Sequence, residues 1–499
     1  MLGAPVHAQE FVTRSADTLL LEGAPWYFQG ANAYMLPAAA ARGDTAGVEE
    51  IMATMEHIGL TVLRTWAFYD ATDSTDPAII QSAPGRWHES GLQGLDYVVA
   101  SAARHGLRLI LPLVNNWDDF GGMNQYVRWR SSAAGEPLLR AIPPEAAPVR
   151  AIVGARGQFY LSFPVAGLSH DLFYTDPVIL GWYLAYVEMI LARVNTRNGI
   201  RYRDDPTILA WELANEPRSS DVTGTIVGSW IDSTARRVKS LDSHHLLGTG
   251  EEGFDVHDAA YSTWSYAGQR WMFDGTAGIS FSRNVTSTNV DIAGIHLYPD
   301  AWGLPSSAGN VWIRDHLLIA RASGKPLLVG EYGLHPPRAT AYESWLTTVL
   351  ADGGAGAALW QVGGGGLPPD DGYVVTCEGT EDPVCAVLRY HAGLARQKSG
   401  RGFLPPPPPV AFLRTYPNPC HGQAIVYYAL AQEARVSLKL VSLLGQELAV
   451  LVDGYQGAGE RRELFDGRRL PSGVYLGQLR VSFVSGGGFT ASDRIVLLH

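Results

Sequence analysis

Two glutamates, Glu216 and Glu331, are the residues of this 499-residue sequence best suited to acid–base chemistry. Each follows an apolar run and stands in a polar and aromatic cluster, as in Asn215-Glu216 and Glu331-Tyr332. Paired carboxyls cleave glycosidic bonds, because the cationic transition state needs a proton donor beside it and an anion below it. One such glutamate alone would more often be a surface ion-pair partner. Two of them in similar clusters favour catalysis.

Other polar and aromatic residues end or follow the same kind of apolar run. They are Asn32, Tyr34, Arg64, Trp66, Asn115, Asn116, Trp117, Asn215, Glu251, Glu252, His296, Tyr298, Trp360 and Gln361. Glu251 and Glu252 could be mistaken for a catalytic acid. Because their strand lies between the strands of Glu216 and Glu331, we assign them structural or substrate-contact roles.

Eight short runs rich in Val, Ile and Leu alternate with helix-like segments and predict a parallel sheet. The runs are 27–31, 61–66, 108–114, 208–213, 245–249, 291–296, 326–330 and 357–361. Helical spacing marks 92–105, with Gly106 as its stop, and 178–194. Eight such units over some 380 residues have the size of a TIM (β/α)8 barrel, whose chemistry lies at the carboxyl ends of its strands. A doubly wound open sheet is the alternative, but no Gly-rich phosphate fingerprint follows an early strand.

Five consecutive prolines, Pro405 to Pro409, mark the clearest boundary, because they form an extended spacer. We predict a residual signal peptide at 1–8, a barrel domain at 9–400, a linker at 401–410 and a β-sandwich at 411–499. The last of these contains alternating strand patterns at 425–430, 434–440, 473–483 and 494–498.

Composition excludes several classes of function. A net charge of −11 has the wrong sign for binding nucleic acid or anionic lipid by charge. No apolar run is long enough to span a membrane. Of the three cysteines, Cys377 and Cys385 could close one loop in an oxidising compartment, and no matched ligand set predicts a metal site.

The first 400 residues resemble glycoside hydrolase family 5, and within it the endo-β-1,4-mannanases. The stretch from Asp205 to Pro217 is similar to the strand-four signature that holds the acid/base, and Lys325 to Gly333 resembles the strand-seven segment that carries the nucleophile. Motifs similar to those of the mannanase subgroup, in preference to the cellulases, stand at 63–68, 114–126, 250–254 and 295–302. The loop between Asp118 and Asp176 departs from the pattern, so its shape is not predicted.

The resemblance implies that Glu216 is the general acid/base and Glu331 the nucleophile of a retaining double displacement. Arg64 and Tyr298 would hydrogen-bond the nucleophile, Asn215 the sugar 2-hydroxyl, and His296 would line the site. Trp360 would be the platform beneath the sugar at the cleavage point, although a core role for it is compatible. Further candidates for sugar contacts are Trp66, Trp117 and Trp302, and for each of them a role in core packing is an equal alternative. Asn115 is a further substrate-binding candidate.

The last 90 residues resemble the C-terminal sorting domain of type IX secretion cargo. The matching pieces are 416–419, 443–448, 451–454, 470–475 and 495–498. A carbohydrate-binding sandwich is the rival interpretation, but its tyrosines and phenylalanine form no visible row.

We therefore expect a secreted or cell-surface monomer that hydrolyses mannan, glucomannan or galactomannan without a cofactor and engages the type IX export machinery. The alternatives are a family 5 β-1,4-glucanase and a non-catalytic carbohydrate-binding barrel.

Overall fold

The computed structural model shows the elements of the chain in detail. It describes residues 10–498 apart from 73–74, 134–150, 154–158, 162–169, 263–265, 267–268, 369–370, 378–381, 402–413, 417, 431–432, 444, 458 and 484–487. The predicted signal residues 1–8, most of the linker and much of the 118–176 loop therefore lie outside the described residues. No helix in the described part is long and apolar enough to cross a membrane.

Eight parallel strands form the central sheet, in the order β12-β11-β8-β5-β4-β15-β14-β13. Their bounds are β4 Phe28–Asn32, β5 Val62–Arg64, β8 Arg108–Pro112, β11 Ile208–Glu212, β12 Leu246–Gly248, β13 Ala293–Leu297, β14 Leu327–Tyr332 and β15 Gly356–Leu359. A parallel bridge between Gly248 and Ile292 joins the two ends of this order, so that the sheet nearly closes. The predicted TIM-type barrel is confirmed, and the open-sheet alternative is wrong.

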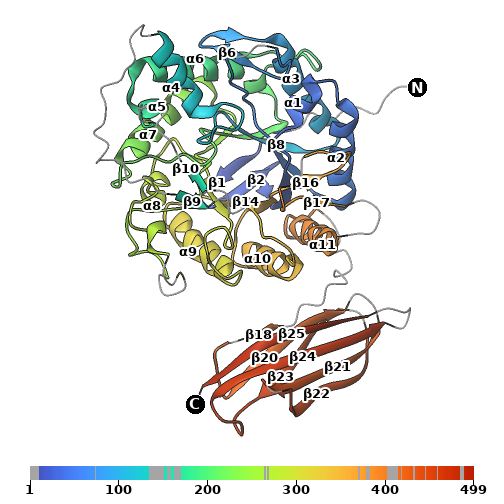
Figure 1. Ribbon diagram of the computed structural model, residues 1–499. Helices are drawn as coiled ribbons and strands as arrows, with labels where there is room; N and C mark the ends of the chain where they lie inside the picture. The colour runs from blue at the N-terminus through green and yellow to red at the C-terminus, as the bar shows by residue number, and fades with distance from the viewer. Residues whose placement is uncertain are drawn as a thin grey trace, which may run out of the picture.

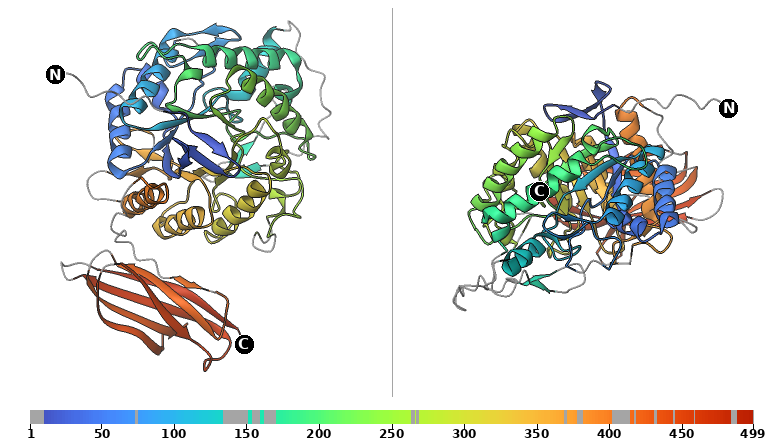
Figure 2. Two further views of the ribbon diagram at one scale, coloured as in Figure 1. Left: turned by 180° about the vertical axis from the view of Figure 1, so that it is seen from behind. Right: turned by 90° about the horizontal axis from the view of Figure 1, so that it is seen from above.

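Helices surround this sheet (Figures 1 and 2). They include α2 Thr45–Ile58, α3 Glu89–Arg104, α4 Gly122–Ala133, α6 Pro177–Ala192, α7 Thr225–Leu241, α9 Ala308–Ala322, α10 Ala339–Ala351 and α11 Pro383–Lys398. Both helices predicted by periodicity, α3 and α6, are present. Gly106 follows α3 with a φ of 66°, a left-handed conformation that glycine adopts without strain.

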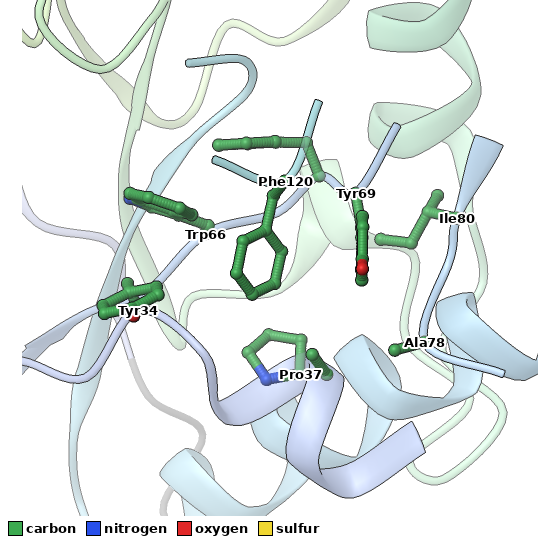
Figure 3. Close-up of a pocket in the computed structure, with 9 residues that line it drawn as sticks. Tyr34, Pro37, Trp66, Tyr69, Ala78, Ile80 and Phe120 are labelled. Atoms are coloured by element: carbon green, nitrogen blue, oxygen red, sulfur yellow. The ribbon is translucent and has the colours of Figure 1, made fainter. Parts of the chain in front are cut away.

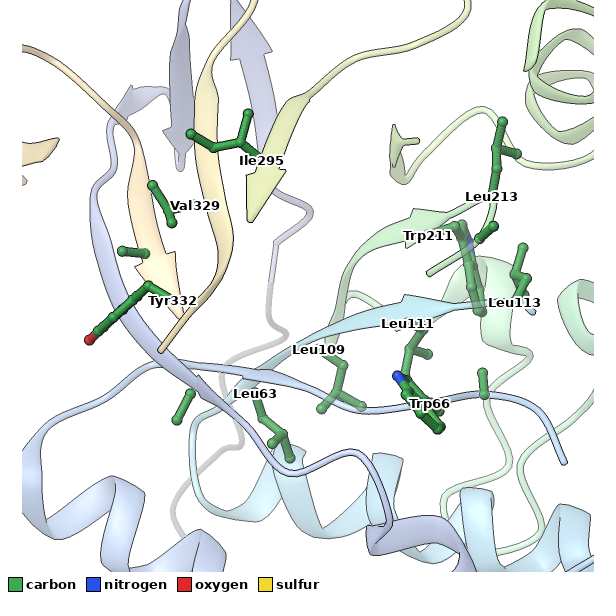
Figure 4. Packing of buried hydrophobic residues seen from close by; sticks show 14 of the residues in the cluster. Leu63, Trp66, Leu109, Leu111, Leu113, Trp211, Leu213, Ile295, Val329 and Tyr332 are labelled. Atoms are coloured by element: carbon green, nitrogen blue, oxygen red, sulfur yellow. The ribbon is translucent and has the colours of Figure 1, made fainter. Parts of the chain in front are cut away.

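Alternation along each strand divides the apolar residues between two clusters. Leu63, Leu109 and Leu111 belong to the cluster that packs against the helices (Figure 4). Val62 and Ile110, one position away, belong to a second cluster that also includes residues of β2 Thr18–Leu21. Because side chains alternate between the two faces of a strand, Arg64 has the same direction as Val62 and points into the barrel mouth.

The C-terminal region is all-β and consists of two sheets, a three-stranded β18-β20-β23 and a five-stranded β19-β25-β24-β21-β22. The bounds are β18 Arg414–Tyr416, β19 Cys420–His421, β20 Gln423–Leu430, β21 Ala434–Ser442, β22 Glu447–Gln456, β23 Gly459–Asp466, β24 Gly473–Phe483 and β25 Gly488–Leu498. Its own apolar cluster includes Val436, Leu438 and Leu479, all fully buried. The four strand patterns predicted from the sequence correspond to β20, β21, β24 and β25, whereas β18, β19, β22 and β23 were not predicted.

Cys377 and Cys385 form a disulfide that links the segment after β15 to α11, and Cys420 is a buried free thiol. Protein isolated under oxidising conditions and unfolded in denaturant is expected to show one reactive thiol per chain, from Cys420. After reduction it is expected to show all three cysteines of the sequence. A thiol-reagent titration measures both numbers, and three thiols before reduction would contradict the pairing.

Candidate active site

Glu216 lies four residues beyond the end of β11, in a turn anchored to two neighbouring strand ends. The backbone N–H of Asn215 donates to the Val114 carbonyl at 2.7 Å, and that of Glu216 donates to the Gly250 carbonyl at 2.8 Å. Glu216 has a φ of 52°, a left-handed conformation that is uncommon for a residue with a side chain. Strain of this kind persists only where surrounding contacts fix it, and it is concentrated at functional sites.

A β-bulge aims Glu331 into the barrel mouth. Along β14, Leu328 faces the barrel interior and Val329 the helices, so strict alternation would turn Glu331 towards the helices. The register slips instead, because Ile295 pairs with Val329 while His296 pairs with Glu331, which leaves one extra residue on β14. Bulges re-aim side chains next to active sites, and this one places Glu331 opposite Glu216.

The Arg64 guanidinium connects the two carboxyl-bearing strands. It donates to Glu331 Oε1 at 2.5 Å, to Glu212 Oε2 at 2.8 Å and to the Asn215 side-chain oxygen at 2.8 Å. Asn32 accepts a further bond from the same group. Arg64 is fully buried, so these partners supply all the charge compensation that the solvent would otherwise provide.

Two more groups contact the carboxyls. The Tyr298 hydroxyl donates to Glu331 Oε2 at 2.5 Å. His296 Nδ1 lies 2.7 Å from Glu216 Oε1 and 3.5 Å from Glu331 Oε2, and one donor atom from each of these three residues falls within 4.8 Å of the others. An oxygen of Glu216 therefore lies within 4.8 Å of an oxygen of Glu331.

Glu216 is held from its other side by a short chain of contacts. Trp117 Nε1 donates to Glu216 Oε2 at 2.6 Å. The Arg218 guanidinium lies over the Trp117 ring, 5.2 Å from its centroid, and over the Phe254 ring at 4.9 Å. Arg218 is paired with both oxygens of Glu252, at 2.6 and 2.7 Å. The side chain of Glu216 is thus fixed by an indole that is itself packed under a buried ion pair.

Burial raises the pKa of both catalytic candidates, and their neighbours act unequally against it. For Glu216 the opposing groups are the Arg218 guanidinium, the Trp117 hydrogen bond and the more distant Arg64. The pKa of Glu331, also raised by burial, is lowered by His296 and Arg64 and by the Tyr298 hydrogen bond. Because Glu331 has a guanidinium and a phenol in direct contact, we assign the negative charge to Glu331 and the shared proton to Glu216.

Aromatic rings gather beyond the ends of β4 and β5, where Figure 3 shows Tyr34, Trp66 and Phe120 around a small hollow. The rings of Tyr34 and Trp360 are stacked almost parallel, with centroids 5.4 Å apart. Tyr34 also contacts Trp66 and Phe120, and these three rings help to line a small hollow beside the strand ends. Flat apolar faces of this kind suit the faces of sugar rings.

The remaining candidates fall into different surroundings. Asn115 is fully buried and accepts a hydrogen bond from the Asn215 amide at 3.0 Å, so it supports Asn215. Trp302 is 8% exposed and packs against Phe254 and Trp312, which favours its core alternative. Trp66 is 5% exposed and stacks on Phe68.

Three functional residues were not predicted from the sequence: Glu212, Arg218 and Asp371. Glu212 and Arg218 flank the predicted Asn215-Glu216 pair, and their closeness to it in the chain was the available signal. Asp371 accepts hydrogen bonds from Trp360 and Gln361 but comes from a Gly- and Pro-rich stretch without any pattern. Glu251 is fully buried against Thr249 and Asn284, which fits its structural assignment.

A barrel with two facing carboxyls and aromatic rings at its carboxyl-terminal rim is typical of a glycoside hydrolase. A model of the glycoside hydrolase family 5 β-mannosidase-like family matches residues 9–353, and the chain belongs to this family.

Relatives and solved structures agree with this membership. Mannan endo-1,4-β-mannosidase F of Aspergillus clavatus is 32% identical over 398 residues, covering 77% of this chain and 79% of the relative. The structure of an endo-β-1,4-mannanase from Thermotoga petrophila covers 95% of this chain and 98% of its own, with 27% identity and a TM-score of 0.66. An endo-1,4-β-mannanase structure from Rhizomucor miehei covers 78% of this chain and 100% of its own, with 29% identity and a TM-score of 0.64.

Replacing Trp117 tests the assignment of the proton. The Trp117 hydrogen bond stabilises the charged form of Glu216 and so lowers its pKa. Trp117→Phe removes the donor, and the pKa of Glu216 is expected to rise. Since the alkaline limb of the kcat/KM profile reports loss of the proton from the acid, that limb is expected to move to higher pH. An unchanged limb, measured on a soluble oligosaccharide, would contradict Glu216 as the acid.

Proposed function

We propose that this chain is a secreted, retaining endo-β-1,4-mannanase that acts on mannan, glucomannan or galactomannan. The observation that carries the proposal is the placement of Glu216 and Glu331 within 4.8 Å of each other, with the Arg64 cation on Glu331. Retaining enzymes have carboxyl groups about 5–5.5 Å apart, whereas inverting enzymes leave room for water at about 6.5–9.5 Å.

In the first step, Glu331 attacks the anomeric carbon while Glu216 donates its proton to the leaving oxygen. Arg64 donates to Oε1 of the attacking carboxylate and the Tyr298 hydroxyl donates to Oε2. These two contacts hold the carboxylate in one orientation. In the second step, the ionised Glu216 accepts a proton from water while the water oxygen attacks the anomeric carbon, and the bond from that carbon to Glu331 breaks to release the sugar. His296 lies between both carboxyls, where it lines the path of this proton.

Asn215 is placed to contact the sugar at the cleavage point. Its side-chain oxygen accepts from Arg64, and one hydrogen of its amide nitrogen goes to Asn115. The second hydrogen is left for the 2-hydroxyl, a contact that strengthens as the ring flattens in the transition state. We assign Trp360 as the platform for the same sugar.

The choice of mannan over glucan rests on the relatives and on the mannanase-like motifs. The two substrates differ in the orientation of one hydroxyl, a difference that a few contacts decide. A β-1,4-glucanase is therefore the closest rival. The non-catalytic alternative is disfavoured, because both carboxyls are retained together with their orienting partners Arg64 and Tyr298.

Secretion is supported by the Cys377–Cys385 disulfide, since such bonds persist in oxidising compartments. For the C-terminal sheets we propose a type IX sorting role, on the order and spacing of the motifs from Tyr416 onwards. We further propose that the enzyme works as a monomer without a cofactor, because both catalytic carboxyls and their partners belong to one barrel.

The substrate assignment is tested by comparing reducing ends released from mannan and from carboxymethyl cellulose. Release is expected from mannan, and activity on the cellulose derivative alone would contradict the proposal.

Glu331→Ala is expected to abolish hydrolysis while oligosaccharide binding, measured by calorimetry, persists. In a serine protease, which also works through a covalent intermediate, loss of one catalytic group lowers kcat by about 10⁴- to 10⁶-fold, so turnover at the wild-type rate would refute Glu331 as the nucleophile.

The stereochemical assignment has a separate readout. Proton NMR of early hydrolysis should show the β-anomer as the first product, because two displacements restore the starting configuration. Initial formation of the α-anomer would establish inversion. It would then follow that Glu331 activates water and does not attack the sugar.

A further inference from the structure

The segment after β15 returns to the active site as a strap, which we define as residues 371–377. Within it, β17 Val375–Thr376 pairs in parallel with β16 Val362–Gly363. Its last residue, Cys377, is bonded to Cys385 of α11. Both ties lie at the C-terminal end of the strap, so this end is joined to β16 and to α11.

A buried cation fixes the middle of the strap. The Arg338 guanidinium, 6% exposed, donates to the carbonyls of Tyr373 at 2.9 Å and Val374 at 2.6 Å, and more weakly to that of Gly372. Three consecutive carbonyls on one guanidinium leave this backbone little freedom. Such anchoring exceeds what a connecting loop needs.

Asp371 uses both oxygens of its carboxylate at the start of the strap. Oδ2 accepts from Trp360 Nε1 at 2.9 Å and from Gln361 Nε2 at 3.0 Å. Oδ1 accepts from the backbone N–H of Tyr373 at 2.9 Å. One side chain thus joins the rigid strap to the indole of Trp360.

These contacts fix Trp360 in two ways. The nearly parallel stack on Tyr34, with 4° between the ring planes, sets the tilt of the indole. The bond to Asp371 sets its rotation within that plane, because only one orientation points Nε1 at the carboxylate. With the stack alone, the indole could turn or slide over Tyr34.

The strap also reaches the partner of the nucleophile. The Tyr373 ring packs edge-on against Tyr298, with centroids 5.5 Å apart, and Tyr298 donates to Glu331. Gly333 permits this approach, since a Cβ there would lie 2.6 Å from Tyr298 and 2.8 Å from Tyr373. Trp360 and Tyr298 therefore both contact the strap, the first through Asp371 and the second through Tyr373.

We propose that Asp371 is a positioning residue that orients Trp360 beneath the sugar at the cleavage point, with the strap as its rigid support. The proposal rests on the proposed function, in which Trp360 contacts that sugar. Small misplacements of a positioning group are costly, because about 1 Å can lower a rate by about 10²-fold.

The test measures kcat and KM on mannohexaose for the wild type, Asp371→Ala, Asp371→Asn, Trp360→Ala and the Trp360→Ala/Asp371→Ala double variant. Asp371→Ala is expected to lower kcat/KM by at least about tenfold, within the range that misplacement produces. Asp371→Asn is expected to lower kcat/KM less than Asp371→Ala does. Its amide oxygen still accepts from Trp360, and only the bond from the Tyr373 N–H is lost, because the NH₂ group faces that donor. If Asp371 acts through Trp360, removing Asp371 in the Trp360→Ala background should change kcat/KM by less than about twofold.

A matched control separates positioning from general destabilisation. Asp242 Oδ2 accepts from Trp211 Nε1 at 2.8 Å, as Asp371 does from Trp360, and it also contacts His245 Nδ1 at 2.6 Å. Asp242 itself lies before the start of β12, at the opposite end of that strand from the rim. Asp242→Asn is expected to lower the melting temperature and to leave kcat/KM within about twofold, because remote and independent sites contribute additively.

Three outcomes would overturn the proposal. Asp371→Ala with wild-type kcat/KM would remove the positioning role. An undiminished loss in the Trp360→Ala background would show that Asp371 acts elsewhere. No turnover of mannohexaose by the wild type would contradict the proposed function itself, a result distinct from the other two because it appears before any variant is compared.

Discussion

The buried guanidinium of Arg64 is the interaction on which the site depends. It lies at the end of β5 with no exposure to solvent, so its charge must be balanced by protein groups alone. Glu212 and Glu331 supply two negative charges from strands on either side of the barrel. Burial alone would lower the pKa of Arg64, but these two carboxylates raise it, so the cation is permanent. Burial raises the pKa of Glu331, and His296 and this permanent cation act against that rise.

Glu212 gives Arg64 a second charged partner besides the candidate nucleophile Glu331. If Arg64 faced Glu331 alone, the pair would be complete, and formation of the sugar ester would leave a buried unpaired cation. In the proposed mechanism, Arg64 keeps Glu212 as a charged partner on its Nε edge when Glu331 becomes covalently bound. The three groups would then change from one excess negative charge to none, and the cation would not be left unpaired.

Much of this architecture was accessible from the sequence, since all eight barrel strands are marked by apolar runs and their polar ends mark the rim. The partners of the rim residues were less accessible. Glu212 stands inside the apolar run of β11, and a single polar residue in such a run does not show which way its side chain points. In the tail, the strand β22 has exposed Val450 and Tyr455 and lacks the clean alternation that identified β21. Long-range pairing formed these features, and a local pattern does not record it.

Both catalytic candidates depart from regular backbone geometry, and each departure turns a glutamate side chain into the site. Alternation would turn Glu331 away, and the bulge in β14 turns it back. A regular turn would keep φ negative at Glu216, and the left-handed conformation there aims its side chain across the mouth at His296. Neither departure is favourable by itself, since the bulge interrupts the strand pairing and a left-handed residue with a side chain costs on the order of 1–3 kcal/mol. The packed barrel holds both, because relaxing either would break a buried contact, that of Glu331 with Arg64 or that of Glu216 with His296.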